Sequence, residues 1–143
     1  MGNISYEFQV EKDDFERAGE ASSKIKKILR QLGMDSGIIR RVAIGAYEAE
    51  INLVIHSLGG IISFSIEPKS ITIIAKDSGP GIENVELAMK EGYSTAPERI
   101  REMGFGAGMG LPNMKKCSDS FSIESVVGKG TVITMKMMLK DGD

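Results

Sequence analysis

Strand-like segments occur in adjacent pairs along this sequence, and their order limits the folds open to the chain. Apolar residues alternate with polar ones at about 4–10, 62–66 and 71–75, which predicts three strands. Two further strands are predicted at about 121–127 and 131–139. Short turn-forming stretches join the members of each later pair, so we expect two β-hairpins after the first strand.

Helix-like segments lie between these strands. Helical spacing of apolar residues predicts helices at about 14–32, 36–57, 85–91 and 111–118. Asp13 or Asp14 can cap the first helix, and Asp35 or Ser36 can cap the second. Ile44 has a spacing that would let it join the buried face of the second helix.

Because strands pair with strands and helices are grouped, we expect an α+β fold. Its form would be a two-layer α/β sandwich, with helices on one face of a mixed, mostly antiparallel sheet. The length of 143 residues suits a single domain over residues 1–143. The glycines of 106–110 do not follow a strand, and no Gly-Lys-Ser/Thr run is present, so neither a dinucleotide fold nor a Walker loop is indicated.

Charge and composition argue against several classes of partner. The net charge of −2 gives no reason to expect nucleic acid or an anionic membrane. The most apolar stretch, 51–66, is interrupted by Asn52, His56 and two glycines, so it is a poor membrane span. No signal peptide is expected at the N-terminus. With Cys117 as its one cysteine, the chain suits a reducing compartment, and we expect a cytoplasmic location.

Two glycine-rich turns, at Asp77–Gly81 and Gly104–Leu111, flank a charged connector. Glycine is used where the backbone dihedral φ must be positive or where a ligand must approach the backbone closely. Successive free backbone N–H groups in such turns form anion-binding concavities. The two turns therefore predict a nucleotide site.

Glu48, Asn52 and His56 follow one another at intervals of four residues on the second predicted helix, so they share one side of it. One interpretation is a solvated polar row beside a core face. The other is that Asn52 gives an oxygen to Mg²⁺, which shares its coordination with phosphates. Glu48 would then act as a base or position a water beside the phosphate. A lone histidine such as His56 is more often a packing or capping residue than a catalyst.

Asp77 ends a predicted strand and opens the first glycine turn. Its carboxylate can accept a hydrogen bond from the exocyclic amine of a bound base. The alternative is an ordinary Asp-Ser-Gly turn, which is common. Thr131 follows a Gly-Lys-Gly hairpin turn at the start of the last strand, and the turn explains that segment equally well.

At this point the sequence resembles a known group, the GHKL ATPase superfamily, which includes gyrase, Hsp90, histidine kinases and MutL. Four segments resemble its sequence boxes in order: Glu48–His56, Asp77–Gly81, Gly106–Leu111 and Gly128–Thr131. Within the superfamily, the chain is most similar to the anti-sigma factor and switch-kinase branch, the serine/threonine kinases of bacterial partner-switching systems. The segments 92–95 and 110–116 are especially like the stressosome-type switch kinases.

The resemblance implies a Bergerat ATP-binding fold that uses ATP and Mg²⁺. Glu48 matches the general base, Asn52 the Mg²⁺ ligand and Asp77 the adenine-binding carboxylate. The other positions that match nucleotide-binding residues are Gly79, Gly81, Gly106, Gly108, Gly110, Leu111 and Thr131.

The resemblance also implies a lid at about 92–107, between the two glycine turns. In the anti-sigma lid a threonine and an arginine approach the phosphates, which suggests Thr95 for binding and Arg101 for catalysis. An arginine at a γ-phosphate is chemically apt. Arg99 is the rival for that role, and solvation of both arginines is the alternative.

The leading functional hypothesis is an anti-sigma regulatory factor with protein serine/threonine kinase activity. It would use ATP to phosphorylate a small antagonist protein on a serine or threonine, with a sigma factor or other regulator as a further partner and a homodimer as an option. A nucleotide-sensing binding module without kinase activity is the first alternative. A detached histidine-kinase catalytic domain is the second, and it ranks lower because His56 is the chain's one histidine.

Overall fold

The structure is a computed structural model, and it describes residues 4–56, 59–79, 89 and 110–139. Within these residues, one five-stranded sheet has the strand order β1-β2-β3-β5-β4, and every neighbouring pair is antiparallel. Its strands are β1 (Ile4–Val10), β2 (Gly60–Ile66), β3 (Ser70–Asp77), β4 (Ser120–Val126) and β5 (Gly130–Met138). The five predicted strands are thus confirmed, to within two residues at each end.

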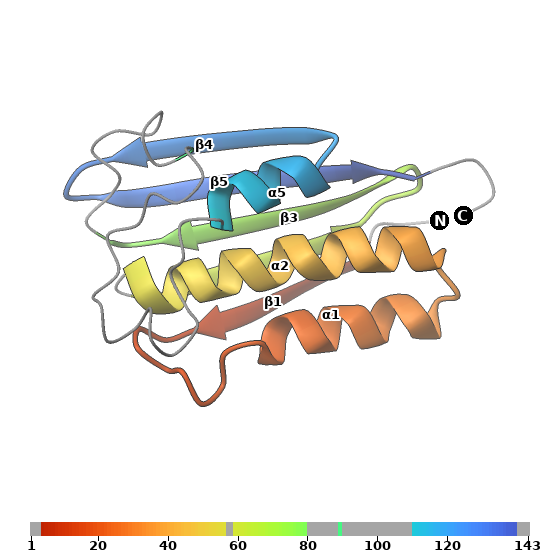
Figure 1. The fold of residues 1–143 in the computed structure, drawn as a ribbon, viewed down its shortest axis with the longest axis horizontal. Coiled ribbons are helices and arrows are strands. Elements are labelled where there is room, and N and C mark those ends of the chain that lie inside the picture. The colour runs from red at the N-terminus through yellow and green to blue at the C-terminus, as the bar shows by residue number, and fades with distance from the viewer. Residues whose placement is uncertain (1–3, 57–58, 80–88, 90–109, 140–143) are drawn as a thin grey trace.

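Helices α1 (Glu20–Gln31), α2 (Ser36–His56) and α5 (Gly110–Cys117) lie on one face of the sheet (Figure 1). The expected α+β sandwich is therefore confirmed, with a sheet that is antiparallel throughout its described part. The predicted lid at 92–107 lies outside the described residues, as does the predicted helix at 85–91 except for Met89.

Helix α2 lies at the centre of the helical layer, between α1 and α5 (Figure 1). Its inward side chains, among them Val42, Ala46 and Leu53, are fully buried above Phe64 and other apolar side chains of the sheet. Neighbouring helices cover its flanks, so α2 is apolar around much of its circumference. The result is a long rigid element that fixes the polar side chains on its remaining surface.

The predicted role of Ile44 in the core is wrong. Its side chain is 38% exposed, as is that of Tyr47, one turn further along α2. Residues three apart on a helix share a side, and this side of α2 faces outward. The spacing of apolar residues correctly predicted the helix. It does not show how much of the helix surface the neighbouring elements cover.

The predicted start of α1 at Asp13 or Asp14 is also wrong, because the helix begins at Glu20 after Gly19. The preceding loop is held differently: the backbone N–H of Asp13 donates to the carbonyl of Val54 on α2, at 2.9 Å. Asp14 instead forms an ion pair with Arg17. With these contacts in place, the chain becomes helical only at Glu20.

The other predicted cap is confirmed. The carboxylate of Asp35 accepts a hydrogen bond from the backbone N–H of Gly37 at 3.0 Å, and α2 begins at Ser36. An aspartate in this position satisfies a backbone donor that the helix leaves without an internal partner.

Candidate functional site

Glu48 of α2 faces the first turn of α5. One carboxylate oxygen, Oε1, accepts a hydrogen bond from the side-chain amide of Asn113 at 3.5 Å. The other, Oε2, lies 3.3 Å from the place that a β-carbon on Gly110 would occupy. A side chain at position 110 would therefore press on this carboxylate. Leu111 anchors the same turn of α5 in the core.

Burial raises the pKa of the Glu48 carboxyl above its ordinary value of 4.5, although the Asn113 hydrogen bond opposes the shift. Desolvation disfavours the charged form of an acid. A carboxylate with a raised pKa is a better proton acceptor, which is the property a general base needs.

Asp77 occupies the end of β3, and its Oδ1 atom accepts a hydrogen bond from the backbone N–H of Thr131 on β5, at 3.1 Å. Thr131 is 4% exposed, and its hydroxyl lies 2.8 Å from that of Ser125. A β-carbon on Gly130 would collide with the backbone carbonyl of Asp77. This close approach of the two strands requires glycine at position 130.

The pKa of Asp77 is raised by burial, against the opposing effect of hydrogen bonds from the backbone N–H groups of Thr131 and Gly79. Those two bonds restrain the carboxyl group. A carboxylate accepts hydrogen bonds at both oxygens, so Asp77 retains acceptor capacity for an outside donor such as an exocyclic amine.

Asn52 follows Glu48 by one turn of α2 and is half-buried. The next residue, Leu53, approaches Gly60 of β2, which pairs directly with Asp77. The later part of α2 therefore lies above the end of β3. Figure 1 shows these two ends at the same side of the molecule. The helix ends at His56.

The side-chain oxygens of Glu48 and Asn52 on α2 are suitable ligands for a hard cation such as Mg²⁺, which prefers oxygen ligands. Among the described residues, no group of three or more His, Cys, Asp or Glu side chains could hold a metal ion. A cation at Asn52 would thus take its remaining ligands from water and from phosphate oxygens, as Mg²⁺ commonly does.

Comparison with known protein families shows which family the chain belongs to. The histidine kinase-like ATPase domain family matches residues 12–137, which is most of the chain. The chain belongs to this family. The sequence resemblance to the GHKL superfamily is thereby confirmed.

Curated relatives show which branch of the histidine kinase-like ATPase family this chain resembles. The chain is 38% identical over 100 residues to an anti-sigma F factor of Clostridium acetobutylicum, a match that covers 66% of each chain. It is 35% identical over 122 residues to an anti-sigma F factor of Clostridium novyi, covering 81% of this chain and 82% of the relative. It is 31% identical over 112 residues to the serine/threonine-protein kinase RsbT of Bacillus subtilis, covering 76% and 78%. These relatives support the expected anti-sigma and switch-kinase branch.

Several residues with predicted roles in the histidine kinase-like ATPase site lie outside the described residues. They are Gly81, Thr95, Arg99, Arg101, Gly106 and Gly108. Of those described, the structure brings Asp77 together with Thr131, and Glu48 together with Gly110. Asn52 lies one helical turn after Glu48, and among the described residues no side-chain hydrogen bond joins it to either pair.

Sequence reasoning gave no role to Asn113 or to Gly130. Asn113 lies one turn after Gly110 on α5, which could have marked it as a neighbour of whatever the glycine turn contacts. The partner itself, Glu48, lies 65 residues away in sequence. No local pattern could have paired them.

Proposed function

We propose that this histidine kinase-like ATPase domain is a protein serine/threonine kinase of the anti-sigma type. Its substrate would be a small antagonist protein with an acceptor serine or threonine, and a sigma factor or another regulator would be its second partner. The proposal places the chain in the cytoplasm and leaves a homodimer open. The observation that carries it is the half-buried Glu48 carboxylate, held against the first turn of α5, one helical turn before Asn52.

The relatives' names support the same class of activity. Two of them are named anti-sigma F factors, and the third is named a serine/threonine-protein kinase. No helix in the described part of the chain is long and apolar enough to cross a membrane.

In the proposed reaction, Glu48 accepts the proton of the acceptor hydroxyl. The raised pKa of its carboxyl brings its basicity closer to neutral pH. Asn113 and Gly110 restrict the positions open to the carboxylate. ATP and Mg²⁺, when bound, supply the phosphoryl group and neutralise part of its charge.

The remaining described residues of the proposed site would bind and orient the nucleotide and its metal ion. Asp77 would accept a hydrogen bond from the exocyclic amine of the base, beside Thr131. Asn52 would hold Mg²⁺ through its side-chain oxygen. The first turn of α5, from Gly110 and Leu111, offers backbone N–H groups to the phosphates, because a helix leaves its first donors without internal partners.

On sequence grounds, we extend the proposal to the predicted lid and to the two glycine-rich turns. Thr95 and the glycines Gly79, Gly81, Gly106 and Gly108 would contact the nucleotide. Arg101 would stabilise negative charge on the transferring group, as a guanidinium does through charge-assisted hydrogen bonds.

The substitution Glu48→Gln tests the role of the base. We expect phosphoryl transfer to fall by about 10²-fold or more, while the Kd for ATP and Mg²⁺ stays within about threefold of wild type. Transfer would be followed with ATP labelled at the γ-phosphate and candidate antagonist proteins. Glu124→Gln is the matched control, because Glu124 is an exposed glutamate on β4.

Transfer by Glu48→Gln at the wild-type rate would show that Glu48 is not the base. Binding of ATP by the wild-type chain, without transfer to any antagonist, would favour a nucleotide-sensing binding module. Absence of ATP and ADP binding would exclude both functions.

A further inference from the structure

A second feature lies away from the nucleotide residues, at one of the two edges of the described sheet. Strand β1 is an edge strand, because it pairs only with β2 in the described sheet. No backbone hydrogen bond outside that pairing involves Ile4–Val10 among the described residues. An edge strand of this kind presents a row of free backbone N–H and C=O groups.

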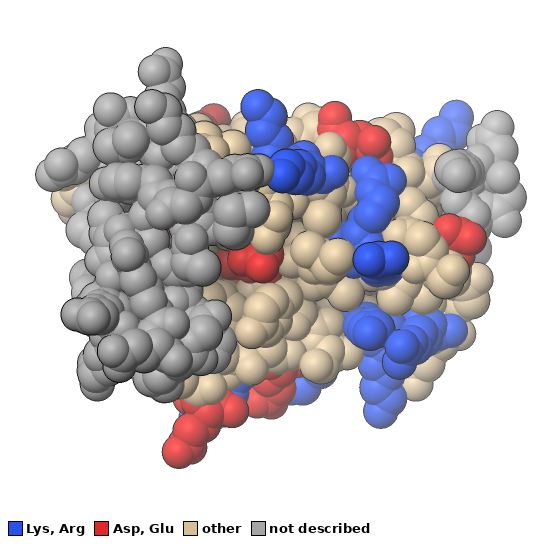
Figure 2. Space-filling model, in the orientation of Figure 1, with Lys and Arg blue, Asp and Glu red and all other residues tan. Residues whose placement is uncertain are grey.

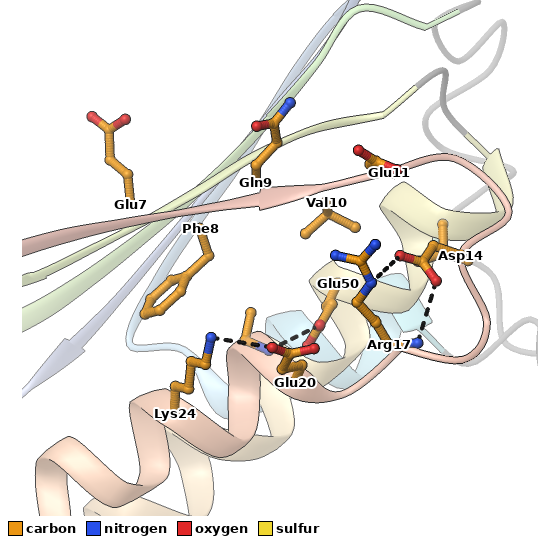
Figure 3. A pocket seen from close by; sticks show the side chains of 12 residues that line it. Glu7, Phe8, Gln9, Val10, Glu11, Asp14, Arg17, Glu20, Lys24 and Glu50 are labelled. Carbon is orange, nitrogen blue, oxygen red and sulfur yellow. Dashed lines mark hydrogen bonds and ion pairs between the residues drawn. The ribbon is translucent and has the colours of Figure 1, made fainter.

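A cavity of about 310 Å³ runs along this edge, between β1 and the start of α1 (Figure 3). The five consecutive residues 7–11 all line it. Successive side chains of a strand point to opposite faces of a sheet. A cavity lined by every residue in turn must therefore follow the strand's edge, where both faces and the backbone can be reached.

Part of the inner wall of the cavity is apolar. Phe8 and Val10 of β1 line it, together with Ala21 of α1 and Val54 of α2. Figure 3 shows the ring of Phe8 directed from β1 toward α1. Small apolar side chains could be buried here.

The charged residues that line the cavity are mostly acidic, and among them Glu50 is buried. Five carboxylates and two cations line it, which gives a formal excess of three negative charges: Glu7, Glu11, Asp14, Glu20 and Glu50 against Arg17 and Lys24. Both cations are already in ion pairs, Arg17 with Asp14 at 3.1 Å and Lys24 with Glu20 at 3.2 Å. Neither Glu7 nor Glu11 has a side-chain hydrogen bond or ion pair within the described residues.

The acidic character is local. Figure 2 shows Asp and Glu side chains gathered along one edge of the helical face, near the loop before α1. Lys and Arg side chains gather toward the opposite end of the helices. A positively charged segment would therefore be attracted to the end of the helical layer where α1 begins and repelled from the opposite end.

From these observations we infer that the edge of β1 is a docking groove for an extended, basic segment of a partner protein. The segment adds to the sheet as a further strand beside β1, and its backbone pairs with the free edge. Its apolar side chains enter the cavity beside Phe8, and its Lys or Arg side chains meet Glu7 and Glu11. Strand addition of this kind takes affinity from main-chain pairing and specificity from alternate side chains.

The test uses a synthetic nine-residue peptide of alternating Lys and Val, capped at both ends and labelled for fluorescence anisotropy. We expect saturable binding that weakens with added salt, as charge attraction is screened. The acidic counterpart, with Glu in place of Lys, should not bind. A peptide N-methylated at alternate residues, on the edge that would pair, should bind at least about tenfold more weakly.

Charge reversal locates the site. Glu7→Lys should weaken peptide binding at least about tenfold, whereas Glu124→Lys should leave it unchanged. Both residues are exposed glutamates on edge strands, at opposite ends of the sheet, so the two variants have the same net charge. Hydrogen exchange should show protection of β1 amides by the peptide, with no change in β4.

Equal peptide affinity of Glu7→Lys and the wild-type chain would overturn the proposal, as would protection of β4 in place of β1. Self-association that protects β1 and excludes the peptide would assign the edge to a second copy of the chain. Because the groove contains none of the proposed nucleotide-binding residues, either result leaves the kinase proposal intact, and loss of ATP binding would not affect this test.

Discussion

At the scale of single residues, Glu48 is held in place by two features of α5. The helix offers a donor, Asn113, to one carboxylate oxygen and leaves space for the other at Gly110. Burial raises the pKa of this carboxyl and the Asn113 hydrogen bond lowers it. The balance between these two effects sets the pH at which Glu48 becomes a usable base.

Replacing Asn113 with Ala should therefore change the pH dependence of phosphoryl transfer. With the lowering contribution removed, the pKa of Glu48 rises further, and the acidic limb of the rate profile moves to higher pH. At a pH well above the pKa of Glu48 in both proteins the rate should change little, because the carboxyl is ionised in both. The measurement is transfer rate against pH, with Lys115→Ala as a control on the exposed side of the same helix. An unmoved acidic limb would mean that Asn113 does not act on the base.

At the scale of elements, α1 is capped by a residue of another helix. Its own N-cap position is Gly19, which has no side chain to offer. Glu50 of α2 is 2% exposed, and its two carboxylate oxygens accept hydrogen bonds from the backbone N–H groups of Ala21 and Ser22, at 3.0 and 3.1 Å. A carboxylate at a helix N-terminus also interacts favourably with the helix dipole. The contact joins α1 to the helix that holds Glu48.

The substitution Glu50→Gln should weaken this junction. A carboxamide offers one acceptor where the carboxylate offers two, so one buried N–H group loses its partner. We expect the free energy of unfolding to fall by about 1–3 kcal/mol, measured by urea denaturation. Amides of the first turn of α1 should also exchange faster with solvent. Glu20→Gln, on the exposed start of the same helix, is the control, and an equal loss there would refute a special role for Glu50.

At the scale of the whole molecule, we expect the two carboxyl groups of the proposed site to reduce stability at neutral pH. The pKa values of Glu48 and Asp77 are both raised by burial. An acid with a raised pKa in the folded state stabilises the fold most when protonated, and this stabilisation is lost as pH rises through the raised pKa. Asp119 behaves in the opposite way: the backbone N–H of Met138 lowers its pKa, so its contribution is lost as pH falls through the lowered value.

Glu48→Gln should consequently raise the free energy of unfolding at pH 7, by about 1 kcal/mol, because it removes a partly buried charge from a functional site. The difference from wild type should shrink toward pH 4, where the native carboxyl is protonated and uncharged. Urea denaturation at both pH values measures it, with Glu124→Gln as the exposed control. A difference that grows on acidification would contradict the assigned direction of the pKa shift.

The local sequence determined much of this protein. Alternation and helical spacing predicted the strands and the long α2, because both periods are set by backbone geometry over a few residues. The Asp35 cap and the hairpin turn before Thr131 are equally local. The glycine turns and the Glu48–Asn52 row pointed to the family that the comparisons confirmed.

Only the tertiary structure decided the rest. The start of α1 depends on Glu50, 29 residues away from the N–H group of Ala21 that it caps. The environment of Glu48 depends on Asn113, and the exposure of Ile44 depends on where α1 and α5 end beside α2. The free edge of β1 exists because β1 has one strand neighbour in the described sheet. Each of these features arises from contacts between segments far apart in the chain, and a pattern read over neighbouring residues carries no information about such contacts.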